Sequence, residues 1–203
     1  MGNQKVVIAT GNQGKLQEFR KLLQPLNIEV LSLEDFPEIG EIEEDGTTFA
    51  QNALIKAKTV NDTVKMISLA DDSGLEVDYL RGLPGVHSAR FAGEPKDDKA
   101  NNDKLLGLLE GVPLEKRTAR FKCVIAIIDF DGKEYLAEGS CEGLILTEEQ
   151  GKAGFGYDPL FYVPQYQKTF AELEMEAKNK ISHRGIATQK AVEILRNIMA
   201  SSQ

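Results

Sequence analysis

Residues 5–32 have the sequence KVVIATGNQGKLQEFRKLLQPLNIEVLS, and this stretch decides the fold class. The β-branched run at 5–10 is typical of a strand, and the glycines of 11–14 end it. Apolar residues then recur over 15–26 with the spacing of one helix face, and 28–32 again has strand character. A strand, a loop, a helix and a strand in this order predict an α/β fold.

The rest of the chain alternates helical and extended segments, with no internal repeat and no obvious linker. Two long alternating segments flank Asp131-Gly132, a dipeptide that predicts a hairpin closed by a type I′ turn. We expect one domain covering residues 1–203, with a sheet-rich middle lobe. The other predicted elements are helices at 47–64, 97–109 and 187–199 and strands at 66–70, 75–79, 117–131, 133–146 and 160–163.

Composition restricts the class of protein. Apolar residues make up 41% of the chain and charged residues 28%, which is ordinary for a globular protein. There is no apolar run of membrane-spanning length, and residues 1–10 predict a strand rather than a signal peptide, so we expect no membrane partner. Cys123 and Cys141 lie far apart without metal-ligand spacing, and we expect buried thiols in a reducing cytoplasm.

The first candidate motif is TGNQGK at residues 10–15. The net charge of −8 argues against nucleic acid as a partner, but not against a small anion held by local cations. Free N–H groups at a helix start favour such an anion, and Lys15 adds a full positive charge. The glycines are too close together for the GxxxxGK[ST] phosphate loop. The alternative is a plain strand–helix turn capped by Thr10 or Asn12.

The second candidate is a pair of acidic dipeptides, Glu43-Glu44 and Asp71-Asp72. Magnesium prefers oxygen ligands and commonly sits between one or two carboxylates and substrate phosphates. Because adjacent strand residues point to opposite faces, only one of the two aspartates is expected to reach a given site. The alternatives are a solvated acidic loop at 38–45 and an Asx-type turn at Asp71.

The third candidate combines GFGYDPLF at residues 154–161 with SHRG at 182–185. Phe155 or Tyr157 could stack on a base, and Asp158 could accept hydrogen bonds from ring N–H groups. Donors at residues 183–184 would favour a base with keto oxygens, since mispaired buried polar groups are costly.

Plainer interpretations exist for this third candidate. The aromatic residues could be core residues, 183–184 could be a helical turn after Ser182, and Lys178, Lys180 and Arg184 could be a solvated basic face. Taken together, however, a phosphate turn, a carboxylate cluster and a base-type pocket indicate a nucleotide with magnesium.

Five segments resemble the inosine triphosphate pyrophosphatase family, which removes non-standard purine nucleoside triphosphates. They are TGNQGKLQEF at 10–19, FAQNALIKA at 49–57, ADDSGLEVDYLRGLPGVHSARFAG at 70–93, GFGYDPLF at 154–161 and KISHRG at 180–185. The resemblance covers nearly the whole chain in the same order. It implies an elongated mixed α/β fold with two lobes around a central nucleotide cleft, and a cytoplasmic homodimer. It also implies Mg2+-dependent hydrolysis of ITP, dITP and XTP to the monophosphate and pyrophosphate.

The resemblance also assigns roles to particular residues. Asp72 would be the proton acceptor and a metal ligand together with Glu43, although Glu44 stays open as the second ligand. An unperturbed aspartate is a weak base at neutral pH, so a metal-bound water is an alternative source of the nucleophile. The substrate-binding residues would be Thr10, Gly11, Asn12, Gln13, Gly14, Lys15, Ser73, Phe155, Gly156, Tyr157, Asp158, Lys178, His183 and Arg184.

Two other functions stay open at this point. One is a related pyrophosphatase that acts on modified pyrimidine nucleotides, and the other is a non-catalytic nucleotide-binding module. The presence of Lys15, Glu43 and Asp72 argues against the second.

Overall fold

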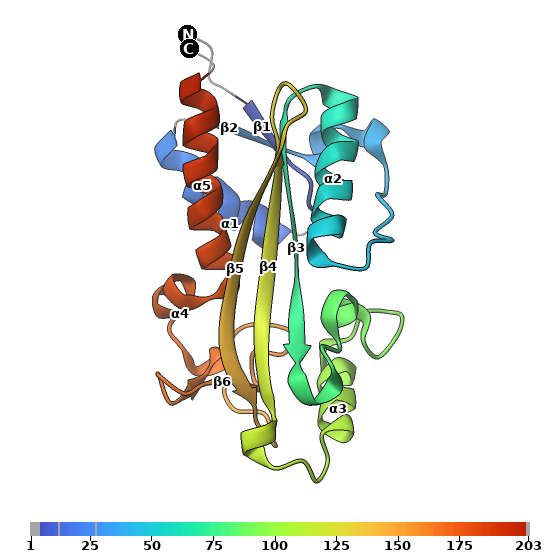
Figure 1. Ribbon diagram of the computed structural model, residues 1–203, viewed down its shortest axis with the longest axis vertical. Helices are drawn as coiled ribbons and strands as arrows, with labels where there is room; N and C mark the ends of the chain where they lie inside the picture. The colour runs from blue at the N-terminus through green and yellow to red at the C-terminus, as the bar shows by residue number, and fades with distance from the viewer. Residues whose placement is uncertain (1–4, 12, 27, 202–203) are drawn as a thin grey trace. The chain divides into compact units, whose positions relative to one another are not determined.

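The computed structural model describes residues 5–11, 13–26 and 28–201. The described strands form one seven-stranded sheet in the order β2-β1-β3-β4-β5-β6-β7 (Figure 1). β1 is parallel to β2 and β3, whereas β6 is antiparallel to β5 and β7, so the sheet is mixed, as expected. The strands are β1 (Lys5–Ile8), β2 (Glu29–Ser32), β3 (Ile67–Val77), β4 (Thr118–Ile128), β5 (Glu134–Ile145), β6 (Phe161–Val163) and β7 (Lys168–Thr169). The α-helices are α1 (Gln13–Leu23), α2 (Phe49–Val64), α3 (Asp98–Leu108), α4 (Met175–Ile181) and α5 (His183–Ser201).

The chain divides into two compact units. Unit 1 takes its described residues from 1–72, 123–138 and 187–203, and unit 2 comprises 73–122 and 139–186. Strands β3, β4 and β5 and helix α5 each contribute residues to both units. No helix in the described part of the chain is long and apolar enough to cross a membrane.

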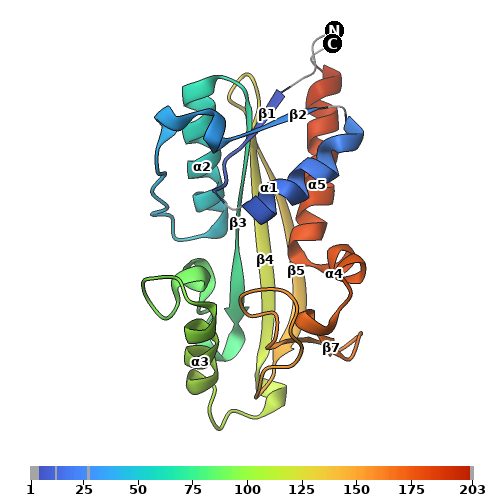
Figure 2. The same ribbon diagram turned by 180° about the vertical axis from the view of Figure 1, so that it is seen from behind.

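In unit 1, helices α1 and α5 pack on one face of the strands and α2 on the other (Figures 1 and 2). The period-two alternation of β3 produces this arrangement. Ile67 and Leu69 face the cluster that contains α1 and α5, whereas the Ser68 hydroxyl donates to the carbonyl of Ala57 on α2, at 2.6 Å. The buried cluster on the α1 and α5 side includes Leu16, Phe19, Leu23, Cys123, Ile125, Ile127, Ala187, Ala191 and Leu195.

In unit 2, the core is built from α3, the 73–77 part of β3 and the aromatic residues of β4 and β6. Phe121 stacks on Phe170 and contacts Phe161, with ring centroids 5.6 and 4.6 Å apart. The buried guanidinium of Arg117 donates to the carbonyls of Leu109, Val112 and Leu146, which ties the end of α3 to the sheet. The core of unit 2 also contains Leu75, Val77, Leu105, Leu109, Ile145, Tyr157 and Leu160.

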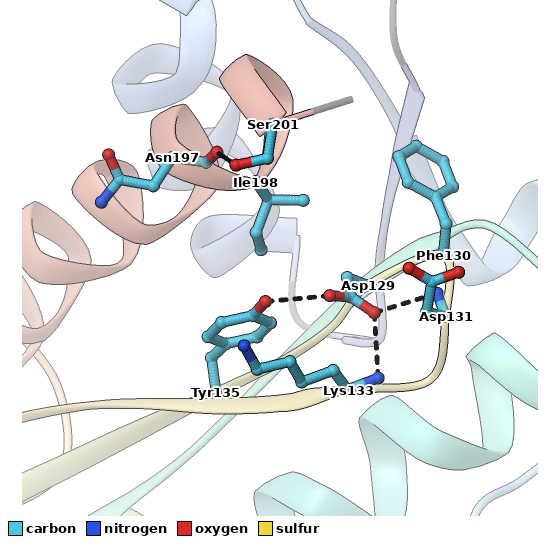
Figure 3. A pocket seen from close by; sticks show the side chains of 8 residues that line it. All are labelled: Asp129, Phe130, Asp131, Lys133, Tyr135, Asn197, Ile198 and Ser201. Atoms are coloured by element: carbon cyan, nitrogen blue, oxygen red, sulfur yellow. Dashed lines mark hydrogen bonds between the residues drawn. The ribbon is translucent and has the colours of Figure 1, made fainter. Parts of the chain in front are cut away.

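The structure corrects two local expectations. β3 is continuous through Asp71-Asp72, so the alternative of an Asx-type turn there is wrong. The hairpin between β4 and β5 is confirmed, but only Gly132 of the Asp131-Gly132 step has positive φ, which excludes a type I′ turn. The Asp129 carboxylate organises this turn by accepting from the N–H groups of Asp131 and Lys133 (Figure 3).

Other boundaries differ by a few residues. Helix α5 begins at His183 rather than 187, and helix α4 and strand β7 were not anticipated. Helix α2 begins at Phe49 because the Thr48 side chain caps it, accepting from the N–H of Gln51. Both cysteines are buried, as expected.

Candidate active site

The loop predicted to bind phosphate connects β1 to α1 in unit 1. β1 ends at Ile8 and α1 begins at Gln13, so Lys15 lies in the first turn of the helix. The Lys15 ammonium lies 2.7 Å from Oδ2 of Asp71, whose side chain is fully buried. Asn12 and the side chain of Gln13 lie outside the described residues. The structure therefore pairs the lysine of this loop with the carboxylate of the neighbouring strand.

Asp71 is a residue whose role the sequence did not reveal. Its side chain is on the same face of β3 as Ile67 and Leu69, which is the face covered by α1. A buried carboxylate needs a partner, and Lys15 supplies one with only a fifth of its own side chain exposed. The signal in the sequence was the alternation of side chains along the strand, because two adjacent residues point to opposite faces and cannot both reach the same site.

Asp72 lies on the opposite face of β3, beside α2. Its Oδ2 accepts a hydrogen bond from Nδ2 of Asn52 at 3.1 Å. Burial raises the pKa of the Asp72 carboxyl, while the positive charge of Lys56 and the bond from Asn52 act in the opposite direction. Asp72 is thus held in place and only partly solvated.

Two residues of the FAQNALIKA segment organise this carboxylate. Asn52 accepts from the N–H of Gly46 at 2.8 Å, and a Cβ at Gly46 would lie 2.5 Å from that amide oxygen. The Lys56 ammonium donates to Oε2 of Glu44 and to the carbonyl of Asp71, both at 2.8 Å. Helix α2 therefore holds both the acidic loop at 38–45 and strand β3, which carries Asp72.

Glu43 and Glu44 differ in their surroundings. The Glu44 carboxylate is bound to Lys56, and its charge is one of the influences that raise the pKa of Asp72. Glu43 is exposed. Within the described chain, no group of three or more His, Cys, Asp or Glu side chains is arranged to hold a metal. Magnesium does not require one, because it commonly takes one or two carboxylates together with substrate phosphates and water. The hard oxygens of Asp72 and the acidic segment fit that donor set.

The residues predicted to bind the base lie in unit 2. Phe155 is 55% exposed, and the Lys178 ammonium lies 5.4 Å and the Arg184 guanidinium carbon 5.8 Å from the centroid of its ring. Arg184 also donates to the Ser73 hydroxyl at 3.2 Å. Four predicted substrate-binding residues are thus brought together as an exposed aromatic face flanked by two cations.

Asp158 acts inside the 154–158 loop. Its Oδ2 accepts from the N–H of Phe155 at 2.9 Å and from Lys178 at 2.5 Å. A Cβ on Gly154, where φ is +81°, would clash with this carboxylate, so only glycine fits. The buried Asp158 therefore closes the loop and orients Lys178.

Tyr157 and His183 are buried, in contrast to Phe155. The Tyr157 hydroxyl donates to the carbonyl of Ser88 at 2.8 Å, and burial, with a contribution from the charge of Asp98, raises its pKa. The His183 imidazole stacks on Phe121 with centroids 4.8 Å apart. Of the two aromatic residues expected to stack on a base, Phe155 is the one whose ring is accessible.

The start of α5 has the geometry of a helical turn after Ser182. The Ser182 hydroxyl accepts from the N–H of Gly185 at 3.1 Å, and a Cβ on Gly185 would clash with the carbonyl of Asn179. His183 and Arg184 therefore project from the first turn of the helix, as the plainer interpretation of this segment had it.

A cavity of about 440 Å³ lies in unit 1, between the β4–β5 turn and the end of α5 (Figure 3). None of the residues that line it belongs to the predicted site. They are Asp129, Phe130, Asp131, Lys133, Tyr135, Asn197, Ile198 and Ser201.

Comparisons with known proteins identify the family to which the chain is similar. Residues 6–194 match the model of the Ham1 family. A dITP/XTP pyrophosphatase of Desulforamulus reducens is 61% identical over 194 residues, which is 96% of each chain. A dITP/XTP pyrophosphatase of Bacillus cereus is 52% identical over 191 residues, 93% of each chain.

Solved structures show the same similarity. A HAM1 protein from Coxiella burnetii superimposes with a TM-score of 0.90 at 41% identity, covering 96% of this chain and 99% of that one. The Staphylococcus aureus Ham1 protein gives a TM-score of 0.89 at 39% identity, with the same coverage. The family expected from the five sequence segments is thereby confirmed, and the chain belongs to the Ham1 family.

Proposed function

We propose that this chain hydrolyses non-standard purine nucleoside triphosphates, namely ITP, dITP and XTP, to the monophosphate and pyrophosphate. The observation that carries the proposal is the arrangement around Asp72. A half-buried carboxylate is held by Asn52, and Lys56 is bonded to the adjacent carbonyl of Asp71. The relatives named dITP/XTP pyrophosphatases support the choice of substrate.

The residues of unit 1 would act on the triphosphate. Lys15 and Lys56 supply positive charge that can compensate phosphate oxygens, and the positive end of the α1 dipole adds to it. Both lysines are already oriented by bonds to Asp71, so little side-chain entropy is lost on binding.

Asp72 would accept the proton of the attacking water. The water oxygen forms a bond to the α-phosphorus, the bond from that phosphorus to the bridging oxygen breaks, and pyrophosphate leaves. When bound by Asp72 with Glu43, Mg2+ would supply Lewis-acid stabilisation of the phosphate charge.

The residues of unit 2 would select the base. The exposed ring of Phe155 offers a stacking surface, and Arg184 and Lys178 offer donors beside it. Hypoxanthine and xanthine carry a keto oxygen at C6, where adenine carries an amino group. Donors at this position therefore favour ITP and XTP over ATP, since an amino group would leave them unpaired.

The Mg2+ requirement, the homodimer and the cytoplasmic location are also proposals, carried by the resemblance to the family. A test of the whole proposal is pyrophosphate release from ITP, dITP, XTP, ATP, dTTP and UTP, each with and without Mg2+. We expect release from the first three only, and only with Mg2+. Preference for dTTP or UTP would favour the pyrimidine alternative, and no release from any nucleotide would favour a non-catalytic module.

A further inference from the structure

Helix α3 contacts the 154–158 loop through two side chains that the site described above does not use. Oδ2 of Asp98 accepts from the N–H of Gly156 at 2.8 Å. One turn further along, Nδ2 of Asn102 donates to the carbonyl of the same glycine at 3.1 Å. Residues four apart lie on one face of a helix, so α3 binds both polar backbone groups of Gly156.

The loop needs such support because of its sequence. Phe155 stands between Gly154 and Gly156, whose φ angles are +81° and +60°. Glycine loses more conformational freedom on folding than any other residue, so this peptide is mobile unless it is bonded on both sides. Asp158 provides one anchor, at the N–H of Phe155, and α3 provides the other, at Gly156.

Asn102 is oriented by its two donors. It is 3% exposed, and its second N–H bonds to Oε1 of Glu149 at 3.0 Å. In the described part of the structure its Oδ1 is buried without a hydrogen-bond partner. A buried acceptor without a partner is costly, and the two donated bonds offset that cost. The side chain thus has one orientation, which fixes the carbonyl of Gly156.

We propose that Asp98 and Asn102 are positioning residues for base recognition: they hold Gly156 and so keep the Phe155 ring beside Lys178 and Arg184. This inference rests on the proposed function, because Phe155 is taken as the stacking surface for the base. A ring that is already in place loses less freedom when a ligand binds, which strengthens binding without changing the chemical step. The residues act through the loop and not on the phosphates.

The test compares Asp98→Ala and Asn102→Leu with Asp103→Ala, all in the full-length chain. Asp103 lies on the same helix and carries the same charge, but it pairs with exposed Lys99. We expect the first two variants to raise KM for ITP about tenfold with kcat changed by less than about twofold, because binding and not chemistry is affected. We expect Asp103→Ala to match the wild type in both constants.

A conservative variant and a structural readout complete the test. Asp98→Asn keeps an oxygen for the N–H of Gly156, so we expect KM to return to within about twofold of the wild-type value. The amide of Gly156 should exchange with solvent deuterium at least about tenfold faster in Asp98→Ala than in Asp103→Ala. Faster exchange with unchanged KM, or unchanged exchange, would overturn the inference.

The proposed function is judged separately. If the wild-type chain releases no pyrophosphate from any nucleotide, the proposed function fails whatever the variants do. If it hydrolyses ITP and Asp98→Ala keeps the wild-type KM, only the role assigned to α3 fails.

Discussion

The ammonium of Lys15 lies 2.7 Å from the carboxylate of Asp71, and the Asp71 side chain is fully buried. Loss of one partner from such a pair leaves the other charge poorly compensated. We therefore expect Asp71→Asn to lower the free energy of unfolding by about 3 kcal/mol, measured by urea denaturation. The exposed pair of Lys5 and Glu29, 3.3 Å apart, provides the control. Glu29→Gln should cost less than about 1 kcal/mol, and equal costs for the two variants would contradict the prediction.

Asp72→Asn should lower kcat by about a thousandfold, because the neutral amide neither accepts the proton nor binds the metal as a carboxylate does. The side chain can still accept from Asn52, so the fold should persist. The measurements are pyrophosphate release and the urea midpoint. Asp62→Asn, on the exposed side of α2, is the control and should keep full activity. Activity of Asp72→Asn near the wild-type level would remove Asp72 from the mechanism.

Glu43→Gln and Glu44→Gln should have different effects. Both side chains are exposed, and the carboxylate of Glu44 is already bound to Lys56. We expect Glu43→Gln to raise the Mg2+ concentration for half-maximal activity about tenfold, since one oxygen ligand is lost. Glu44→Gln should lower kcat by releasing Lys56, with little change in that Mg2+ concentration. The reverse pattern would identify Glu44 as the ligand.

Phe155→Ala should raise KM for ITP by about tenfold, because stacking of a base on an aromatic ring contributes about 1–3 kcal/mol. Tyr166→Ala removes an aromatic side chain that is 41% exposed and lies outside the predicted site, and it should leave KM unchanged. Steady-state kinetics with ITP separate the two. An unchanged KM in Phe155→Ala would show that the base binds elsewhere.

Cys141 should be almost unreactive in the folded protein. Burial, and to a lesser degree the charge of Glu142, raises the pKa of its thiol from 9.0 to about 11. At pH 8 its thiolate fraction is then about a thousandth, against about a tenth in the unfolded chain, so a thiol reagent should react far faster in urea.

The same shift predicts how stability depends on pH. The folded state binds the thiol proton of Cys141 more tightly than the unfolded chain does. The contribution of this group to the free energy of unfolding is therefore complete below pH 9.0 and is lost as the pH rises towards about 11. Cys141→Ser should flatten the pH dependence of the urea midpoint in that window. If the urea midpoint falls equally with pH in the wild type and in Cys141→Ser, the pH dependence comes from groups other than Cys141.

Much of the fold was predictable because it rests on local periodicity. The strand at residues 5–10 and the helices at 47–64 and 97–109 were expected from their apolar spacing and appear as β1, α2 and α3. Strand β7, with two residues, and helix α4, with seven, are too short to give a periodic signal. The β4–β5 turn differed from the expected type because the side chain of Asp129 bonds to its backbone, which a dipeptide rule does not include.

Parts of the candidate site had no local signal at all. The roles of Asn52 and Lys56 depend on residues up to 20 positions away, and the contact of Asp98 with Gly156 spans 58 positions. The choice between Phe155 and Tyr157 also depended on the core of unit 2, which buries one ring and leaves the other exposed.

Asp71 and Asp72 show most clearly what the sequence determines and what the tertiary structure adds. The sequence by itself determined that these neighbours point to opposite faces of a strand, because side chains alternate in any β-strand. Only the tertiary structure decided that α1 covers the face of Asp71 and α2 the face of Asp72. A carboxylate that is fully buried must be paired, so Asp71 is bound to Lys15, whereas Asp72 keeps part of its solvation, which suits the role proposed for it.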